Sequence, residues 1–222
     1  LKVKFQTARG GVDVAKQVGA GNAVVGGGIG DTPIIVRANG IPVKAVAVLG
    51  GHSLMQLVSI AGSGIKGPAD LKGKTVTTLS YQDTTYYALL GMMAKVGLKK
   101  SDVNIQAAGP AGVWKLFLAG KSDAMAGVPD WIGIAMGAGK KLNIIPADKY
   151  FKSMAQAILA SDDTIKNNPE LIQKLVRATL KGMKDIMDDP AGASKDYVAA
   201  VPQHKGKEKA MEGVFRLYNK YV

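Results

Sequence analysis

The chain has 222 residues, of which 47% are hydrophobic, so it is long enough to bury one large core or two smaller ones. Lysine and arginine (29) outnumber the acidic residues (17) and give a net charge of +12, but the aromatic residues do not alternate with the basic runs, which argues against nucleic acid as a partner. The absence of cysteine excludes disulfides and thiolate chemistry, and no apolar run reaches the length of a membrane span.

The first thirty residues alternate apolar segments with glycine turns. Residues 2–5 predict a strand, residues 12–18 a helix, and residues 23–26 a short buried strand. The next turn ends in Gly30 and Asp31, and Asp31 is expected either to cap the following helix or to face a ligand. A dinucleotide-binding loop is not expected, because the third glycine of the G-x-G-x-x-G pattern is absent.

Two further strands are predicted at residues 41–49 and 54–60. The glycines between them place His52 at the end of a strand, and ligands in open α/β sheets collect at the carboxyl ends of strands. His52 is therefore a candidate site residue, and a packed or surface histidine is the alternative interpretation.

The most informative stretch is residues 63–85. It predicts a turn, a short helix, a buried strand and a polar loop that enters a helix at residues 86–96. Free backbone N–H groups and the positive end of the helix dipole meet at such a place, which suits an anion.

The polar loop of this stretch supplies several candidate ligand-binding residues. Gln82, Thr84 and Thr85 are expected to hydrogen-bond an anionic group, with an ordinary helix N-cap cluster as the alternative. Tyr81 could stack on a ring. Asp83 would repel an anion, so it is expected to point away, to cap the helix, or to meet a hydroxyl or amine of the ligand.

Strands and helices continue to alternate through residue 151, which predicts an α/β sheet with helices on both faces. Asp130 and Trp131 follow the strand expected at residues 123–128, so both are candidate site residues, although Trp131 fits the core equally well. A strand at residues 154–159 is expected to return to the first sheet. The helices predicted between residues 169 and 221 are expected to pack there too.

Several of these segments resemble a known family. Residues 63–66 (SGIK) and 70–76 (DLKGKTV) are similar to the signature of the nitrate/sulfonate/taurine and thiamine-precursor-like binding proteins of ABC transporters. Weaker similarities follow in the family's order, at residues 119–124 (AGKSDA), 128–131 (VPDW) and 168–171 (NPEL).

The resemblance implies the type II periplasmic-binding-protein fold, an α/β fold of two lobes that are each a mixed sheet flanked by helices. Lobe 1 is expected at residues 1–61 and 152–222, and lobe 2 at residues 62–151. The first strand and helix of this fold, and a signal peptide, are expected to be missing, because residue 1 already falls in a predicted strand that the family places later.

The same resemblance implies a function. It predicts a monomeric, periplasmic substrate-binding component of an ABC importer, with no cofactor and no metal. This component would capture a small organic anion, such as a sulfonate or a carboxylate, between its lobes and deliver it to a membrane permease.

Two alternatives remain within this family, namely a binding protein for a pyrimidine or thiamine precursor and an enzyme of the same fold. Catalysis is not expected, because the sequence has no G-x-S-x-G or H-E-x-x-H motif. The thiamine-precursor-synthesising relatives also use a cysteine cluster that this chain lacks.

Overall fold

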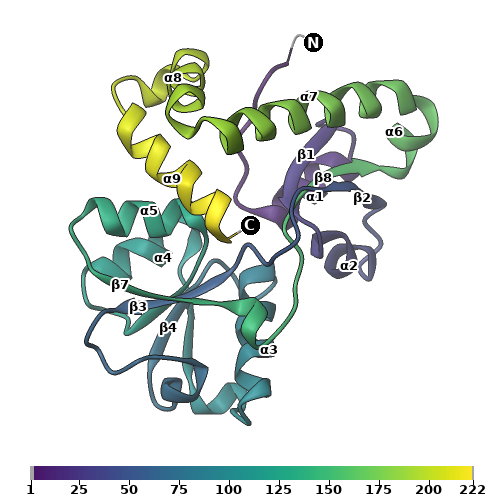
Figure 1. The fold of residues 1–222 in the computed structure, drawn as a ribbon. Helices are drawn as coiled ribbons and strands as arrows, with labels where there is room; N and C mark the ends of the chain where they lie inside the picture. Colours follow the sequence, from purple (N-terminus) through teal and green to yellow (C-terminus); the bar gives the residue numbers. More distant parts are fainter. Residues whose placement is uncertain (1–2, 222) are drawn as a thin grey trace.

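The computed structural model describes residues 3–221, which form two β-sheets flanked by helices (Figure 1). The first sheet has the order β1 (Val25–Ile29), β8 (Gln156–Ser161) and β2 (Val43–Val48), and both outer strands run antiparallel to β8. Every residue of β8 after Gln156 is buried, as expected for a central strand that is covered on both faces.

The second sheet is larger and mixed. Its strands, in order, are β5 (Asn104–Ala107), β4 (Thr75–Thr78), β6 (Ala124–Gly127), β3 (Gln56–Ile60) and β7 (Leu142–Pro146). The strand β4 runs parallel to β5 and β6, whereas β3 runs antiparallel to β6 and β7. The loops that follow β4 and β6 therefore leave the same edge of the sheet.

Helices surround both sheets. We call the first sheet with α1 (Gly11–Gly19), α2 (Thr32–Arg37) and α6 (Asp162–Asn167) the first lobe. The second sheet with α3 (Thr84–Lys95), α4 (Gly109–Leu118) and α5 (Pro129–Gly137) is the second lobe. The C-terminal helices are α7 (Pro169–Asp188), α8 (Pro190–Ala200) and α9 (Glu208–Tyr221).

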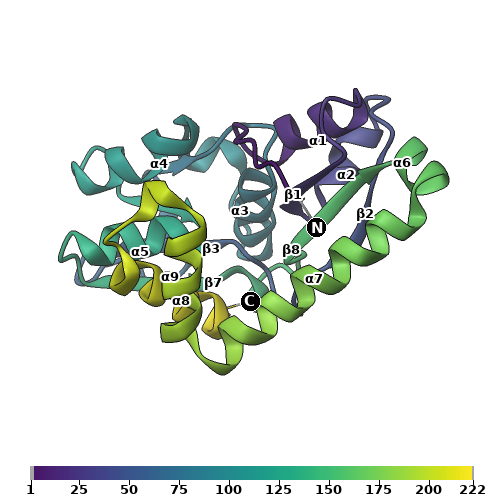
Figure 2. The ribbon, with the colours of Figure 1, turned by 90° about the horizontal axis from the view of Figure 1, so that it is seen from above.

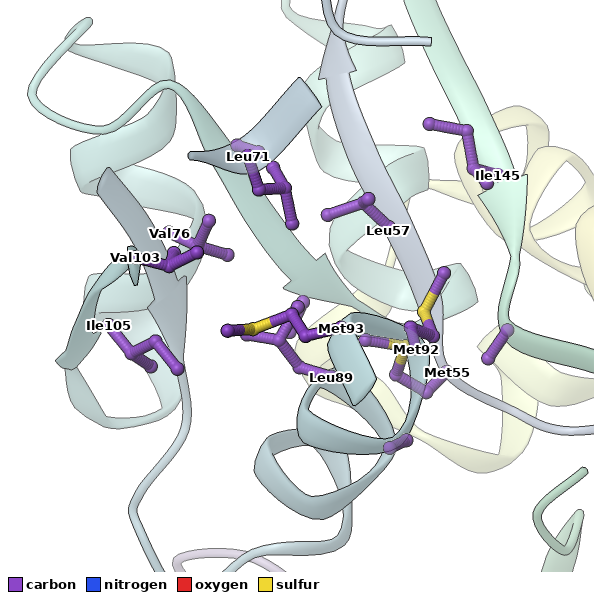
Figure 3. Packing of buried hydrophobic residues seen from close by; sticks show 14 of the residues in the cluster. Met55, Leu57, Leu71, Val76, Leu89, Met92, Met93, Val103, Ile105 and Ile145 are labelled. Atoms are coloured by element: carbon purple, nitrogen blue, oxygen red, sulfur yellow. The ribbon is translucent and has the colours of Figure 1, made fainter. Parts of the chain in front are cut away.

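Helices cover both faces of the second sheet. Leu89, Met92 and Met93 recur on one face of α3 at helical spacing, and they pack on Leu57 and Val76 of the sheet (Figure 3). On the other face, a second cluster contains Val113 and Phe117 of α4, Ile132 of α5 and Met125 of β6. The loops at the sheet edge are thus held by a packed core.

Two crossovers connect the lobes, one at residues 49–55 between β2 and β3 and one at residues 147–155 between β7 and β8. The second crossover packs directly on α3. The ring of Phe151 lies so close to Gly91 that a Cβ atom added there would be 2.4 Å from Phe151 Cγ. Glycine at this position allows the crossover to lie directly against the helix.

The structure corrects several sequence-based expectations. Gln56–Ile60 was expected in lobe 1 but forms β3 in the second sheet, and α9 packs on α5 of the second lobe rather than on the first sheet. Strand order and helix docking depend on distant partners that local patterns do not specify. Residues 3–5 form no strand, and they are not paired with β1, β8 or β2, while the predicted Lys2 lies outside the described residues.

Candidate ligand-binding site

Two loops, one from each lobe, approach each other at the starts of helices. Asp31 follows β1 and precedes α2, and Asp83 follows β4 and precedes α3. The turn before α1 lies against the second of these loops, because a Cβ atom added at Gly10 would be 2.5 Å from Leu79 Cδ2 and 3.7 Å from Asp83 Oδ2. Gly10 also has φ +119°, so both its backbone and its surroundings require glycine.

Asp83 caps α3, as one of the sequence-based alternatives predicted. Its Oδ1 accepts hydrogen bonds from Thr85 N (2.9 Å) and Thr85 Oγ1 (2.8 Å). The residue is only 4% exposed, and this burial raises the pKa of its carboxyl group even though the bonds from Thr85 lower it. The structure thus holds a carboxylate at the place where the sequence predicted an anion-binding loop.

Asp31 occupies the N-cap position of α2, as one of the alternatives predicted, but its side chain makes no capping hydrogen bond. Burial raises the pKa of Asp31, a hydrogen bond from Ser153 lowers it, and the negative charge of Asp83 raises it. The charge of Asp83 therefore acts on Asp31 across the lobes, as the smallest of the effects on its pKa. Among the described residues, neither forms an ion pair with a lysine or arginine.

Several polar atoms around these aspartates are buried without a hydrogen-bond partner. Within residues 3–221 they include Asp31 Oδ1, Thr32 Oγ1 and Thr84 Oγ1. Thr32 and Thr84 are at most 2% exposed. Buried polar groups are normally paired, and leaving one unpaired costs about 1–3 kcal/mol. Such atoms mark places where a bound molecule can supply the missing partners.

Asp31 lies next to hydrogen-bonded residues of both crossovers. Ser153, whose hydroxyl lowers the pKa of Asp31, has this hydroxyl oxygen 3.1 Å from that of Ser53. The backbone N–H of Ser53 donates to both carboxylate oxygens of Asp148 (3.0 and 2.9 Å), and His52 Nδ1 lies 3.1 Å from Asp148 Oδ2. The position of Asp31 is therefore coupled to the segments that would bend if the lobes moved.

A groove of about 680 Å³ lies next to these loops, between the first lobe and the start of α3. It is lined mainly by apolar residues of α1, α2 and the turn after α2, with three polar side chains among them. The lining residues are Val12, Lys16, Ile34, Ile35, Val36, Ala38, Asn39, Ile41, Gln82 and Tyr87. Gln82 directly precedes Asp83 in the chain, so the groove borders the loop before α3, although neither Asp31 nor Asp83 lines it.

The structure brings five of the predicted site residues together at these loops. Asp31 and Thr84 carry unpartnered oxygens, and Gln82 lines the groove. Gly30 donates its N–H to Ala155 O (2.9 Å) and leaves no room for a side chain beside Met154. Thr85 lies at the same loop, but its hydroxyl is engaged by Asp83 and by Thr78 (3.0 Å), so it orients Asp83.

The other predicted site residues lie elsewhere. His52 is on a crossover, with 71% of its side chain exposed. Tyr81 donates its hydroxyl to Ile105 O in β5 (3.1 Å) and packs edge-on against Tyr86. Asp130 faces α9, where Tyr218 donates a 3.4 Å hydrogen bond to it, and Trp131 packs with the core cluster around Phe117.

Sequence reasoning missed two residues of the candidate site. Ser153 and Lys16 lie far from the predicted loops along the chain, and no local motif indicates them. The pairing of Asp31 with Ser153 depends on how β8 returns beside β1, which the sequence does not specify.

The raised pKa of the half-buried Asp31 predicts an unusual pH dependence of stability. Because the pKa of Asp31 is raised above its usual 3.8, the folded state binds more protons than the unfolded state between pH 3.8 and the raised pKa, and stability falls as the pH rises through this window. We expect Asp31→Asn to be more stable than the parent protein at pH 7, with the difference shrinking toward pH 3.8. Urea unfolding between pH 4 and 7 measures it.

Asp162→Asn serves as the matched control with the opposite sign. The bond from Arg37 is the main cause that lowers the pKa of Asp162, so that carboxylate stabilises the fold above its unfolded pKa. Its variant is expected to be less stable than the parent at neutral pH. Equal behaviour of the two variants would contradict the role assigned to burial at Asp31.

Two sheet-based lobes, joined by two crossovers and meeting at a polar site, define the type II periplasmic-binding-protein fold. The alkanesulfonate-binding protein SsuA from Xanthomonas axonopodis pv. citri, solved bound to MOPS, has the same fold, with a TM-score of 0.74 at 20% identity over 94% of this chain and 71% of that chain. The chain belongs to the family described as "NMT1/THI5 like", whose model matches residues 1–193.

Two curated relatives support this assignment. The riboflavin-binding protein RibY of Chloroflexus aurantiacus is 28% identical over 78% of this chain and 50% of its own length. The 4-amino-5-hydroxymethyl-2-methylpyrimidine phosphate synthase THI5 of Saccharomyces cerevisiae is 24% identical over 86% of this chain and 59% of its own length. The chain thus spans between 50% and 59% of the length of these curated relatives.

Two classes of feature are not found in residues 3–221. No described helix combines the length and the apolar character needed to cross a bilayer. The same residues contain no group of three or more histidine, aspartate or glutamate side chains placed to hold a metal ion.

Proposed function

We propose that the protein is the substrate-binding component of an ABC importer, which captures a small organic solute between its lobes and delivers it to a membrane permease. The observation that carries this proposal is a pair of carboxyl groups at facing loops of the two lobes, the half-buried Asp31 and the buried Asp83, with unpartnered oxygens beside them. Family membership and the fold of solute-binding proteins support it. A monomer in the periplasm is part of the same proposal.

The chemistry of these loops also suggests what the buried end of the solute is like. An anionic head placed beside Asp31 and Asp83 would be repelled, whereas N–H or O–H groups would satisfy the carboxylate and hydroxyl oxygens. We therefore infer that hydrogen-bond donors enter first. An acidic group of the solute would remain in the outer groove, where Lys16 supplies a positive charge and Asn39 and Gln82 supply amides.

An N–H-bearing heterocycle meets these requirements better than a simple sulfonate. Its ring edge would donate to the aspartates, and its faces would contact the apolar groove wall at Ile34, Ile35 and Tyr87. The name of the relative RibY, a riboflavin-binding protein, and the pyrimidine product named for THI5 point to the same chemical class. A small organic anion without donors remains the second candidate, supported by the fold shared with SsuA.

Binding and lobe closure are coupled in this proposal. A solute that contacts both Asp31 and Asp83 binds best when the two loops are close. It therefore shifts the population of conformations toward the closed arrangement of the lobes. The hydrogen bonds from Asp31 through Ser153 to Ser53 extend this contact to the crossovers.

A thermal-shift screen tests the proposal, because a ligand that binds the folded state raises the melting temperature. The compounds are riboflavin, a 4-aminopyrimidine, MOPS, an aromatic carboxylate and nitrate. We expect the largest shift from one of the two heterocycles. A shift with MOPS or nitrate alone would overturn the inference about donors, and no shift with any compound would contradict the binding function.

The enzyme alternative is tested on the same compounds. A binding protein returns its ligand unchanged, so mass spectrometry before and after a long incubation with stoichiometric protein should show one species. Conversion of the bound compound would place the chain with the synthases of its family instead.

A further inference from the structure

The C-terminal helices form a connection between the lobes that is separate from the two crossovers. It begins at α6, where Asp162 pairs with Arg37 Nη1 (2.9 Å) and Lys44 Nζ (3.3 Å), so the start of α6 is fastened to α2 and β2 of the first lobe. From there α7 runs toward α8 and α9 above the second lobe, as two perpendicular views show (Figures 1 and 2).

The helix α7 behaves as a rod in this connection. Its 20 residues correspond to a length of about 30 Å at 1.5 Å per residue. Ile172, near its start, is the one buried residue of the helix, and the remaining residues are half-buried or exposed. A continuous helix of this length transmits position from one end to the other.

The far end of the connection is fastened to the second lobe through α9 and α5. Leu217 joins the core cluster of Phe117 and Ile132, and Val214 lies so close to Gly133 that an added Cβ there would be 2.9 Å from Val214 Cγ2. Tyr218 donates to Asp130 Oδ2 (3.4 Å), and burial followed by the charge of Asp130 raises the pKa of Tyr218. Asn219 Nδ2 also donates to Ile186 O of α7 (3.1 Å), which ties α9 back to the rod.

We propose that the segment α6–α9 is a third tie between the lobes, which limits how far they can separate. The two crossovers alone can bend, but a rod fastened to the first lobe at Asp162 and to the second lobe at Gly133 and Asp130 resists separation of its two ends. This inference concerns the protein without ligand and stands or falls independently of the proposed solute.

The joint between α6 and α7 is where this tie can yield. Asn168, at the joint, is exposed, and its side chain makes no capping hydrogen bond to α7. Opening therefore rotates α7 about Asn168 while α9 stays on α5, and the range of rotation is set by the contacts of α9.

Gly133→Val tests the tie, because its branched side chain cannot fit against Val214 and should displace α9. Gly182→Val in α7 is the matched control, since nothing lies within 4 Å of a Cβ there and the helix-propensity cost is the same. The chain has no cysteine, so spin labels at Ala20→Cys in the first lobe and Lys72→Cys in the second report the distance between lobes without ligand. We expect the distance distribution to widen and shift outward in Gly133→Val only.

Hydrogen exchange over residues 208–221 shows whether α9 is released, and Leu217→Asp provides a second route to release. If exchange rises in either variant while the distance distribution stays that of the parent, the tie does not restrain the lobes and the proposal is overturned. If neither variant raises exchange, α9 is not fastened at this contact, and the proposal is overturned as well.

Discussion

Asp83→Ala is expected to weaken solute binding by about 10- to 100-fold, because a hydrogen bond to a charged group contributes about 1.5–3 kcal/mol and each 1.4 kcal/mol is a factor of ten. The substitution removes the acceptor that faces the first lobe and also the cap that holds Thr85 N at the start of α3. Isothermal titration with the compound that gives the largest thermal shift measures the loss. The affinity of Asp83→Asn, which keeps one acceptor oxygen, is expected to lie between that of the parent protein and that of Asp83→Ala.

Asp189→Ala separates the two roles of Asp83. Asp189 caps α8 by accepting a hydrogen bond from Gly192 N (3.0 Å), and α8 lies outside the loops of the candidate site. Losing that cap should cost about 1 kcal/mol of stability and leave affinity unchanged. If affinity fell equally in both variants, the effect at Asp83 would be one of general stability, and the site would have to lie elsewhere.

Phe117→Ala is expected to lower the free energy of unfolding by about 3–5 kcal/mol, the usual range for deleting a buried aromatic ring. Phe117 of α4 is 1% exposed and packs with residues of α5 and the second sheet. Its truncation would leave a cavity next to α5, on which α9 packs. Urea denaturation followed by circular dichroism measures the change. An effect below 1 kcal/mol would mean that this cluster collapses around the gap or is not packed as the structure shows.

Leu180→Ala is the control for this prediction. Leu180 lies on α7 and is 49% exposed, so its truncation is expected to change stability by less than about 0.5 kcal/mol. The contrast between the two variants tests whether stability depends on the second-lobe core or on apolar side chains in general.

Local patterns predicted most of the secondary structure, because they depend on neighbours along the chain. The segment that forms β4 consists of β-branched residues, which favour strands. Asn168 and Pro169 were expected at the start of a helix, and α7 begins at Pro169. The assignment of β3 to the wrong lobe has a different cause. Its residues form a strand with either set of partners, and only the pairing with β6 and β7 decides between the two sheets.

The candidate site was predictable where it follows a local rule. A polar loop between a strand and a helix indicated the loop before α3, and Asp83 was expected as a possible cap because aspartate prefers that position. The contact of Asp31 with Ser153 was not predictable, since 122 positions separate them and no periodicity connects them. The side-chain partner of Asp130 was not predictable either, because only the docking of α9 places Tyr218 beside it.

The unpartnered oxygens between the lobes have opposite effects on stability and on the proposed ligand binding. Replacing Asp31 or Thr84 with a smaller apolar residue would remove an unpaired polar oxygen and is expected to stabilise the protein without ligand. The same mutation would remove groups that we propose bind the solute. Selection for thermal stability alone would therefore favour replacement of these polar residues first. Homologues that keep them are expected to be those that still bind the solute.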